Sequence, residues 1–263
     1  MAENDHPYRM TIDLNVLDHL ADGLYSSVAA VLTEAVANAW DADASEVRIE
    51  LDIAGDRIAI VDNGIGMDRN AMNDRYLRVG YRRRNEGDTS SGGRAVMGRK
   101  GIGKLSLFSI ADRIEVRTLV DGGEPVGLRI ATPDLRTAMT AGLAEYNPEP
   151  LTVEKNEIGA DHGTAVFMTA LKRQRLRDMA PESLRRRLAR RFSVIGSSDF
   201  CVYVNGTMVT PSDRDDLKFV EYLWTFGEKE PDLTVCNNLK NIEQLDERLD
   251  GWRPDWLVHG WIG

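Results

Sequence analysis

One uninterrupted helical pattern constrains the fold of this 263-residue chain more than any other feature. Residues 24–40 have the sequence LYSSVAAVLTEAVANAW, in which apolar residues recur every three or four positions without Gly or Pro. This spacing predicts a long, mostly buried helix. Three polar residues, Glu34, Asn38 and Asp41, are spaced four and three positions apart and therefore project from one face of it.

The polar triplet allows two interpretations. Burying an unpaired carboxylate or amide costs about 1–3 kcal/mol, so these side chains need partners if the helix is buried. They either cap or bridge neighbouring elements of the fold, or they belong to a functional site. The helix alone leaves both interpretations open.

The rest of the chain mixes strands and helices. Residues 46–53 alternate polar and apolar side chains, and after a turn residues 57–61 continue as a second strand, which predicts a hairpin ending at Asp62. Further elements are expected as strands at 113–120, 126–130, 163–171 and 200–204, and as helices at 103–111 and 181–193. Because strict βαβ alternation is absent, we expect an α+β sandwich, with the polar, glycine-rich residues 70–100 as a loop.

A first glycine motif follows the predicted hairpin, in the segment Asp62-Asn63-Gly64-Ile65-Gly66-Met67. Glycines at 64 and 66 permit positive φ and a close approach of the backbone to a ligand. The Asp62 carboxylate can accept a hydrogen bond from an exocyclic amine. Taken alone, this pattern is also typical of turns that simply end strands.

A second glycine motif, Gly98-Arg99-Lys100-Gly101-Ile102-Gly103-Lys104, precedes a predicted helix. Backbone N–H groups at a helix N-terminus suit phosphate. The spacing also approaches that of a P-loop, but Leu105 stands where a magnesium-binding Ser or Thr is required. Since no buried strand precedes Gly98 either, we interpret the segment as a glycine-rich hinge of another kind.

A third short motif, Gly163-Thr164, opens a predicted strand directly after the turn at Asp161 and His162. The Gly-Thr pair is unremarkable by itself. No partner for His162 is evident in the sequence, so we interpret this histidine as an exposed turn residue and not as a catalytic one.

Taken in order, these motifs resemble the four nucleotide-binding boxes of the GHKL superfamily of gyrase, heat-shock chaperones, histidine kinases and MutL. The resemblance covers about residues 8–210 and implies the Bergerat ATP-binding fold, a two-layer sandwich with a mixed, mainly antiparallel sheet covered by helices on one face. The segments NAWDADAS and GRKGIGKLSLFSIAD look closest to MORC-like and chaperone-like members. No upstream helical pair offers a phosphoacceptor histidine, which disfavours a histidine kinase.

The resemblance implies a role for each motif residue. Glu34 would be the general base that polarises the attacking water, and Asn38 would ligate Mg²⁺, with Asp41 near the base. Asp62 would accept a hydrogen bond from the adenine N6 amine, supported by Thr164. The remaining contacts would come from Gly64, Gly66 and Met67 at the adenine, and from Gly98, Gly101, Ile102 and Gly103 at the phosphates, with Lys100 and Lys104 as alternative phosphate contacts.

The resemblance also implies a domain organisation. Residues 1–210 would form the ATP-binding domain, with residues 70–103 as a lid that closes over ATP. Residues 211–263, where twelve acidic residues face six basic ones, would be a linker or the start of a transducer-type domain. We expect the chain to be truncated and to lack a lysine from the next domain that completes the γ-phosphate site in many members, so hydrolysis should be slow.

The expected function is that of a Mg²⁺-dependent ATPase acting as a nucleotide-gated switch. ATP would order the lid and promote homodimerisation, and hydrolysis would reset the switch. By analogy alone, the setting would be DNA maintenance or phage defence. The alternatives are an adenine-nucleotide binding module without turnover and a protein kinase of the same fold.

Charge and composition limit which partners and which cellular compartment we expect for the chain. The net charge of −9 argues against nucleic-acid binding by the whole surface, but nine Lys or Arg residues lie within 172–191. That stretch is either a solvated helix face or a surface for DNA or another partner. No signal peptide or apolar run of 18 residues is present, which predicts a cytoplasmic protein without a membrane partner. Cys201 and Cys236 suggest neither a disulfide framework nor a zinc cluster.

Overall fold

The computed structural model describes eleven stretches of the chain, which fall into two compact units. The units comprise Met1–Leu184 with Ser197–Met208, and Arg185–Gly196 with Val209–Gly263. The described residues are 10–11, 27–78, 87, 89–98, 103–141, 145–177, 179–192, 195, 199–227, 233–246 and 260–263.

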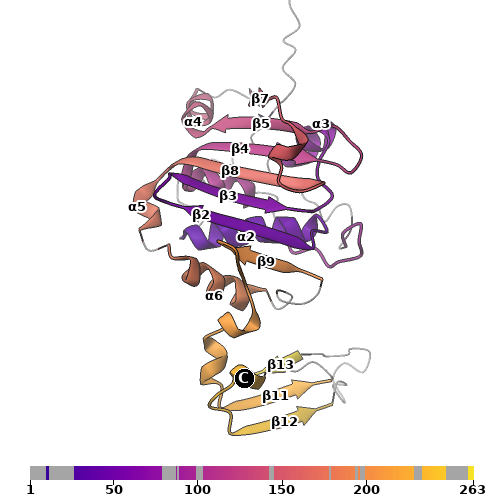
Figure 1. The fold of residues 1–263 in the computed structure, drawn as a ribbon, viewed down its shortest axis with the longest axis vertical. Helices are drawn as coiled ribbons and strands as arrows, with labels where there is room; N and C mark the ends of the chain where they lie inside the picture. Colours follow the sequence, from indigo (N-terminus) through magenta and orange to yellow (C-terminus); the bar gives the residue numbers. More distant parts are fainter. Residues whose placement is uncertain are drawn as a thin grey trace, which may run out of the picture. The chain divides into compact units, whose positions relative to one another are not determined.

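An eight-stranded sheet organises the first unit, with strand order β10-β9-β2-β3-β8-β4-β5-β7 (Figure 1). All neighbours pair antiparallel except β2 and β9, which are parallel. The strands are β2 (Glu46–Asp52), β3 (Arg57–Asp62), β4 (Ala111–Leu119), β5 (Val126–Ala131), β7 (Glu149–Leu151), β8 (Gly163–Leu171), β9 (Cys201–Val204) and β10 (Thr207–Met208). A separate short pair joins β1 (Met10–Thr11) to β6 (Glu145–Tyr146).

Helix α2 (Val28–Asp41) forms where the apolar pattern predicted a helix, and it is drawn behind the sheet in Figure 1. Ser27 caps its first turn by accepting a hydrogen bond from the Ala30 N–H at 3.3 Å. On β2 the buried residues Val47 and Ile49 alternate with the more exposed Glu46 and Arg48, so one face of this strand belongs to the core. The predicted α+β fold with a mixed, mainly antiparallel sheet is confirmed.

Several further helices connect the strands, and some of them lie where a loop was expected. The helical segments are α3 (Arg69–Ala71), the π-helix η1 (Met72–Tyr76), the 3₁₀ helices η3 (Gly103–Ser109) and η4 (Lys155–Glu157), α4 (Thr132–Thr140) and α5 (Arg173–Leu176). Met72 and Leu77 are 0% exposed. The prediction of a loop over 70–100 is therefore wrong for its first residues, because two apolar side chains anchor them in the core.

The second face of the sheet carries charged side chains and a small apolar cluster. Glu115 accepts hydrogen bonds from Arg117 at 2.8 Å and from Arg129 at 2.9 Å. The cluster consists of Leu119, Val153, Ile158 and Ala165. Residues 151–162 thus cover one end of this face and lead directly into β8.

The second unit contains a three-stranded sheet of order β12-β11-β13. Strand β11 (Tyr222–Phe226) pairs parallel with β12 (Asn241–Leu245) and antiparallel with β13 (Gly260–Ile262). Helix α6 (Pro181–Arg191) crosses the boundary between the two units, and the short 3₁₀ helices are η5 (Pro211–Asp213), η6 (Asp216–Phe219) and η7 (Leu233–Val235). Among the described residues, no helix has the length and apolar character needed to cross a membrane.

Candidate nucleotide-binding site

The polar triplet of α2 divides into two residues that solvent can reach and one buried residue. Glu34 is half-buried, Asn38 is exposed and Asp41 is 3% exposed. Within the described part of the chain, neither Glu34 nor Asn38 has a side-chain hydrogen bond or ion pair. Only Asp41 therefore carries the burial cost expected for all three, and the other two side chains are available to a ligand.

Asp41 has its partners in the second glycine motif. Its Oδ1 accepts a hydrogen bond from the Met97 N–H at 2.7 Å, and its Oδ2 accepts one from the Gly98 N–H at 2.8 Å. A Cβ at position 98 would lie only 2.8 Å from Oδ2. Asp41 thus bridges α2 to the backbone that begins the glycine motif.

The first glycine motif packs against the same end of α2. The Ile65 N–H donates to the carbonyl of Ala42, directly after the helix, at 2.9 Å. A Cβ at Gly64 would meet that carbonyl oxygen at 2.7 Å. Both glycine motifs therefore converge on the last turn of the helix that carries Glu34 and Asn38.

Asp62 is a half-buried carboxylate at the end of β3. Burial raises its pKa to about 6, against the lowering effect of hydrogen bonds from the backbone of Gly64 and Thr164 and of the charge of His162. The Gly64 N–H lies 2.9 Å from Oδ1. A carboxylate with these donors keeps spare lone pairs and can still accept a hydrogen bond from a ligand amine.

Two motif glycines are required by the fold itself. Gly66 has φ +66, and a Cβ there would lie 2.1 Å from the carbonyl oxygen of Leu119. Gly163 has φ +124, and its Cβ would lie 2.0 Å from the carbonyl oxygen of Asp62. Close approach between strands therefore explains these glycines without any ligand.

Thr118 connects the first glycine motif to the Gly163-Thr164 motif, and sequence reasoning missed it. Its hydroxyl accepts from the Met67 N–H at 2.8 Å and donates to the Gly163 carbonyl at 2.9 Å, and it lies 3.2 Å from the Thr164 hydroxyl. Thr118 is 0% exposed. The available signal was a hydroxyl at a position of β4 whose inward-facing neighbours, Ile114 and Val116, are apolar.

The interpretation of His162 as an exposed residue without a partner is wrong. The side chain is half-buried, and its Nδ1 lies 2.7 Å from the Gly64 carbonyl oxygen. Since a carbonyl only accepts, Nδ1 carries the proton in this contact. His162 therefore joins the turn before β8 to the first glycine motif.

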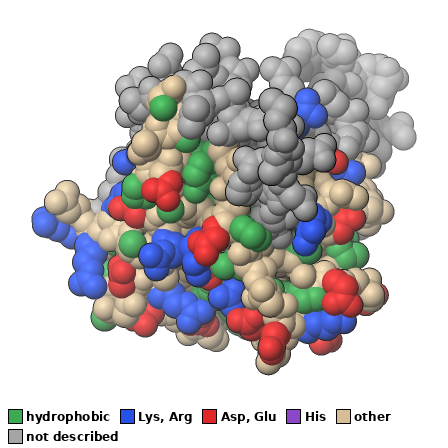
Figure 2. Space-filling view, turned by 90° about the horizontal axis from the view of Figure 1, so that it is seen from above, with side chains coloured by type: hydrophobic (Ala, Val, Ile, Leu, Met, Phe, Trp, Pro, Cys, Tyr) green, Lys and Arg blue, Asp and Glu red, His purple; other side chains and the backbone are tan. Residues whose placement is uncertain are grey.

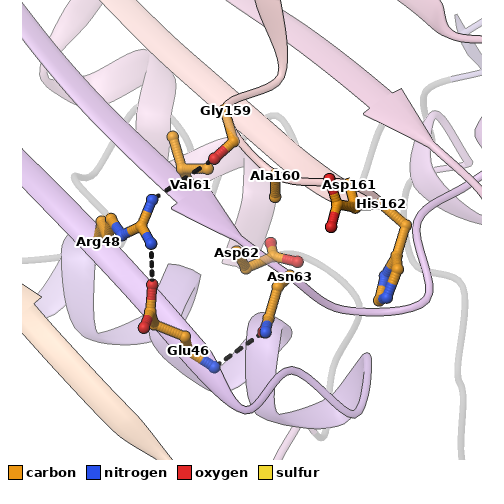
Figure 3. A pocket seen from close by; sticks show the side chains of 9 residues that line it. All are labelled: Glu46, Arg48, Val61, Asp62, Asn63, Gly159, Ala160, Asp161 and His162. Atoms are coloured by element: carbon orange, nitrogen blue, oxygen red, sulfur yellow. Dashed lines mark hydrogen bonds and ion pairs between the residues drawn. The ribbon is translucent and has the colours of Figure 1, made fainter. Parts of the chain in front are cut away.

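A pocket of about 280 Å³ opens beside Asp62 and His162 (Figure 3). Glu46 and Arg48 line it from β2, and residues 159–162 line it from the other side. Because these two β2 side chains alternate with buried Val47 and Ile49, the pocket opens on the sheet face opposite the core. Asp62 and Asn63 also line this pocket, whereas Glu34 and Asn38 do not.

The remaining predicted phosphate contacts are only partly described. Gly98 lies at the end of a described segment, whereas Lys100, Gly101 and Ile102 fall outside the described residues. Only the backbone of Gly103 and Lys104 is described, at the start of η3. In the described stretches, no three His, Cys, Asp or Glu side chains are grouped as metal ligands.

The fold and the converging motifs define a protein of the GHKL class. The chain belongs to the family of histidine kinase-, DNA gyrase B- and HSP90-like ATPases, whose sequence model matches residues 25–164. The match begins just before α2, ends at Thr164, and thus includes all four predicted motifs.

Two curated proteins are similar to this chain in sequence. The chain is 37% identical over 262 residues to the "Putative type II restriction enzyme HgiDII" of Herpetosiphon aurantiacus, covering 99% of this chain and 42% of that protein. It is 35% identical over 129 residues to the DNA mismatch repair protein MutL of Myxococcus xanthus (strain DK1622), covering 45% of this chain and 21% of that protein. The chain thus spans less than half of either relative.

Proposed function

We propose that this chain binds ATP with Mg²⁺ and hydrolyses ATP as a nucleotide-gated switch. The observation that carries the proposal is the convergence of both glycine motifs on the last turn of α2, through Asp41 and Ala42. Membership of the ATPase family supports the same function. A closer likeness to MORC-like or chaperone-like members stays a prediction.

The described residues fit a magnesium nucleotide. Asn38 presents an exposed amide oxygen without a partner in the described structure, so it would hold Mg²⁺, which favours a few protein oxygens together with phosphates. The metal would neutralise phosphate charge. Glu34, one helical turn earlier, would orient and deprotonate the attacking water, and Asp62 would bind the adenine amine.

The switch itself is part of the proposal. Residues 70–103 would close over the nucleotide, and closure would promote homodimerisation. The helical start of this segment is fixed in the core by Met72 and Leu77, so movement would begin after them. The domain boundary at residue 210 likewise stays a prediction.

Replacing Glu34 by Gln tests the catalytic role. The variant keeps the size and hydrogen-bonding capacity of the side chain but removes the base, so steady-state phosphate release should fall about 100-fold or more. Binding of Mg-ATP, measured by calorimetry, should change by less than about threefold. Glu50→Gln, at an exposed position of β2, is the matched control.

Equal phosphate release by the parent protein and Glu34→Gln would refute hydrolysis by this site. Retained ATP binding in that case would leave the binding module without turnover as the function.

Size-exclusion chromatography of Glu34→Gln with and without Mg-ATP tests dimerisation. The dimer should appear only with the nucleotide.

We further propose a setting in DNA processing, because the two relatives are named as a restriction enzyme and a mismatch repair protein. The basic stretch 172–191 offers fewer unpaired positive charges to DNA than its sequence indicates. In α6, Arg185 pairs with Asp213 at 3.3 Å and Arg190 pairs with Asp215. Internal ion pairs thus neutralise part of the stretch. On the face seen from above in Figure 2, which is not the α6 face, Lys and Arg side chains are likewise interspersed with Asp and Glu.

Arg187 and Arg191 are the α6 cations best placed to bind a phosphate backbone. Both are exposed, lie four residues apart on the helix, and have no partner in the described structure. Replacing both by Gln should reduce the salt dependence of retention on duplex DNA, whereas Lys240→Gln should not. No retention of the parent protein at low salt would refute DNA binding by this chain.

A further inference from the structure

Residues 89–98, here named the arm, are fastened to the residues that end helix α2. The arm contains a turn in which the Ser90 N–H donates to the Arg94 carbonyl at 2.7 Å and the Gly93 N–H donates to the Ser90 carbonyl at 3.0 Å. The arm ends at Gly98, the first residue of the second glycine motif. The position of the arm therefore determines where that motif begins.

Asp43 holds the first part of the arm. Its carboxylate accepts hydrogen bonds from the Ser90 hydroxyl and, at 2.8 Å, from the Gly92 N–H. Although burial opposes ionisation, these bonds and the nearby Arg94 hold the pKa of Asp43 below its usual value. Asp43 has φ +58, a conformation that costs free energy for most residues and is best tolerated by Gly, Asn and Asp.

Arg94 holds the middle of the arm. Its guanidinium lies 4.5 Å from the centre of the Trp40 ring and donates to the Ala44 carbonyl at 2.5 Å and the Asp199 carbonyl at 2.8 Å. The Trp40 indole N–H donates in turn to the Ala95 carbonyl at 2.9 Å. A planar cation with several fixed donors is suited to such a junction.

These contacts link the arm to the proposed catalytic helix at three successive points. Asp43, just after the helix, holds Ser90 and Gly92. Trp40 holds Arg94 and Ala95, and Asp41 holds Met97 and Gly98. The same helix carries Glu34 and Asn38. A displacement of α2 therefore moves the start of the phosphate-binding motif with it.

We propose that Asp43 and Arg94 are positioning residues that fix where the second glycine motif begins, at Gly98, relative to α2, as the binding of ATP phosphates requires. This inference rests on the proposed function. Breaking the contacts that hold the arm should therefore weaken the binding of phosphates and leave the binding of the adenosine part unchanged.

Asp43→Gly is the sharpest test. Glycine accepts φ +58 without strain, so the substitution removes the carboxylate while sparing the backbone. Asp56→Gly is the matched control, since Asp56 also has positive φ (+60) and also accepts two hydrogen bonds, in its case both from backbone N–H groups, of Ala170 at 3.1 Å and Leu171 at 2.9 Å. Its contacts join the β2–β3 turn to the end of β8 and do not involve the arm.

The measurements are the calorimetric affinities for Mg-ATP and for adenosine, together with hydrogen exchange of the arm amides. Asp43→Gly should bind Mg-ATP about tenfold more weakly, bind adenosine within about twofold of the parent, and exchange faster at Gly92, Met97 and Gly98. Asp56→Gly should match the parent in all three. Asp43→Asn, which keeps one acceptor oxygen and tolerates positive φ, should recover part of the ATP affinity.

The outcomes separate the inference from the proposed function. Parental ATP affinity in Asp43→Gly, despite faster exchange of the arm, would overturn the positioning role and leave ATP binding intact. An equal loss of ATP and adenosine affinity would overturn it as well, because the effect would then not be specific to phosphates. Absence of ATP binding in the parent protein would refute the proposed function itself.

Discussion

Asp62 is the residue that we propose to recognise adenine, and the burial of its charge lowers the stability of the fold. Its carboxyl group accepts a hydrogen bond from the proposed adenine amine most strongly when it is ionised, yet burial raises its pKa to about 6. At neutral pH the charge is therefore present in an environment that disfavours it. We expect the affinity for ATP to decline below about pH 6, as the carboxylate becomes protonated.

The same raised pKa predicts a pH dependence of stability. The unfolded chain releases the Asp62 proton near pH 3.8 and the folded chain near pH 6, so this group stabilises the fold at low pH and loses its contribution as pH rises to 6. The loss amounts to about 3 kcal/mol. Asp62→Asn lacks the titration, so its free energy of unfolding should increase relative to the parent between pH 4.5 and 7.

Denaturant unfolding of both proteins at several pH values measures this difference. The sign is the decisive feature, because a carboxylate stabilised by ion pairing would show the opposite trend. A difference between parent and Asp62→Asn that stays constant across this pH range would contradict the raised pKa.

The elements of the sheet were largely predictable because their signal is local. Alternating burial in β2 follows the alternating polarity of residues 46–52, and Asn205 and Gly206 both adopt positive φ in the predicted turn after β9. The short strands β6 and β7 were missed because they have only two and three residues. Helix α4 was missed because most of its described side chains are exposed, so it lacks a strong apolar pattern. The DxGxG and Gly-Thr motifs were found by their pattern.

The contacts between elements were not predictable, because they join residues distant in sequence. Asp43 and Ser90 are 47 positions apart, and His162 and Gly64 are 98 apart. Nothing in the sequence near Arg94 indicates that its guanidinium will stack on Trp40. Such pairs depend on how the strands and helices pack, which periodicity does not encode.

Gly66→Ala tests whether strand packing requires the first glycine motif. The new Cβ would collide with the Leu119 carbonyl in addition to adopting an unfavourable positive φ. Gly122→Ala is the matched control, since Gly122 has nearly the same φ (+68) and no atom within 4 Å of a Cβ. We expect a loss of about 3 kcal/mol for Gly66→Ala and about 1 kcal/mol for Gly122→Ala in the free energy of unfolding.

Chemical denaturation of the three proteins measures these losses. Equal destabilisation by the two substitutions would show that conformation alone, and not the close approach of Gly66 to β4, accounts for the glycine. The structural requirement for Gly66 would then have to be withdrawn.

At the scale of the whole molecule, the chain combines a nucleotide-binding fold with a second compact unit built on a three-stranded sheet. It covers 42% of the HgiDII relative and 21% of the MutL relative, so more than half of each relative lies outside the match. We therefore propose the binding and hydrolysis of ATP for this chain, with DNA processing as the proposed setting. Adenine recognition is the step on which both depend.

Calorimetric titration of the parent protein with Mg-ATP and with Mg-GTP tests that claim most directly. We predict saturable binding of one ATP per chain, little or no binding of GTP, and loss of ATP binding in Asp62→Asn, because the ionised carboxylate selects a base with an amine at this position. No binding of ATP, or equal binding of ATP and GTP, would contradict it.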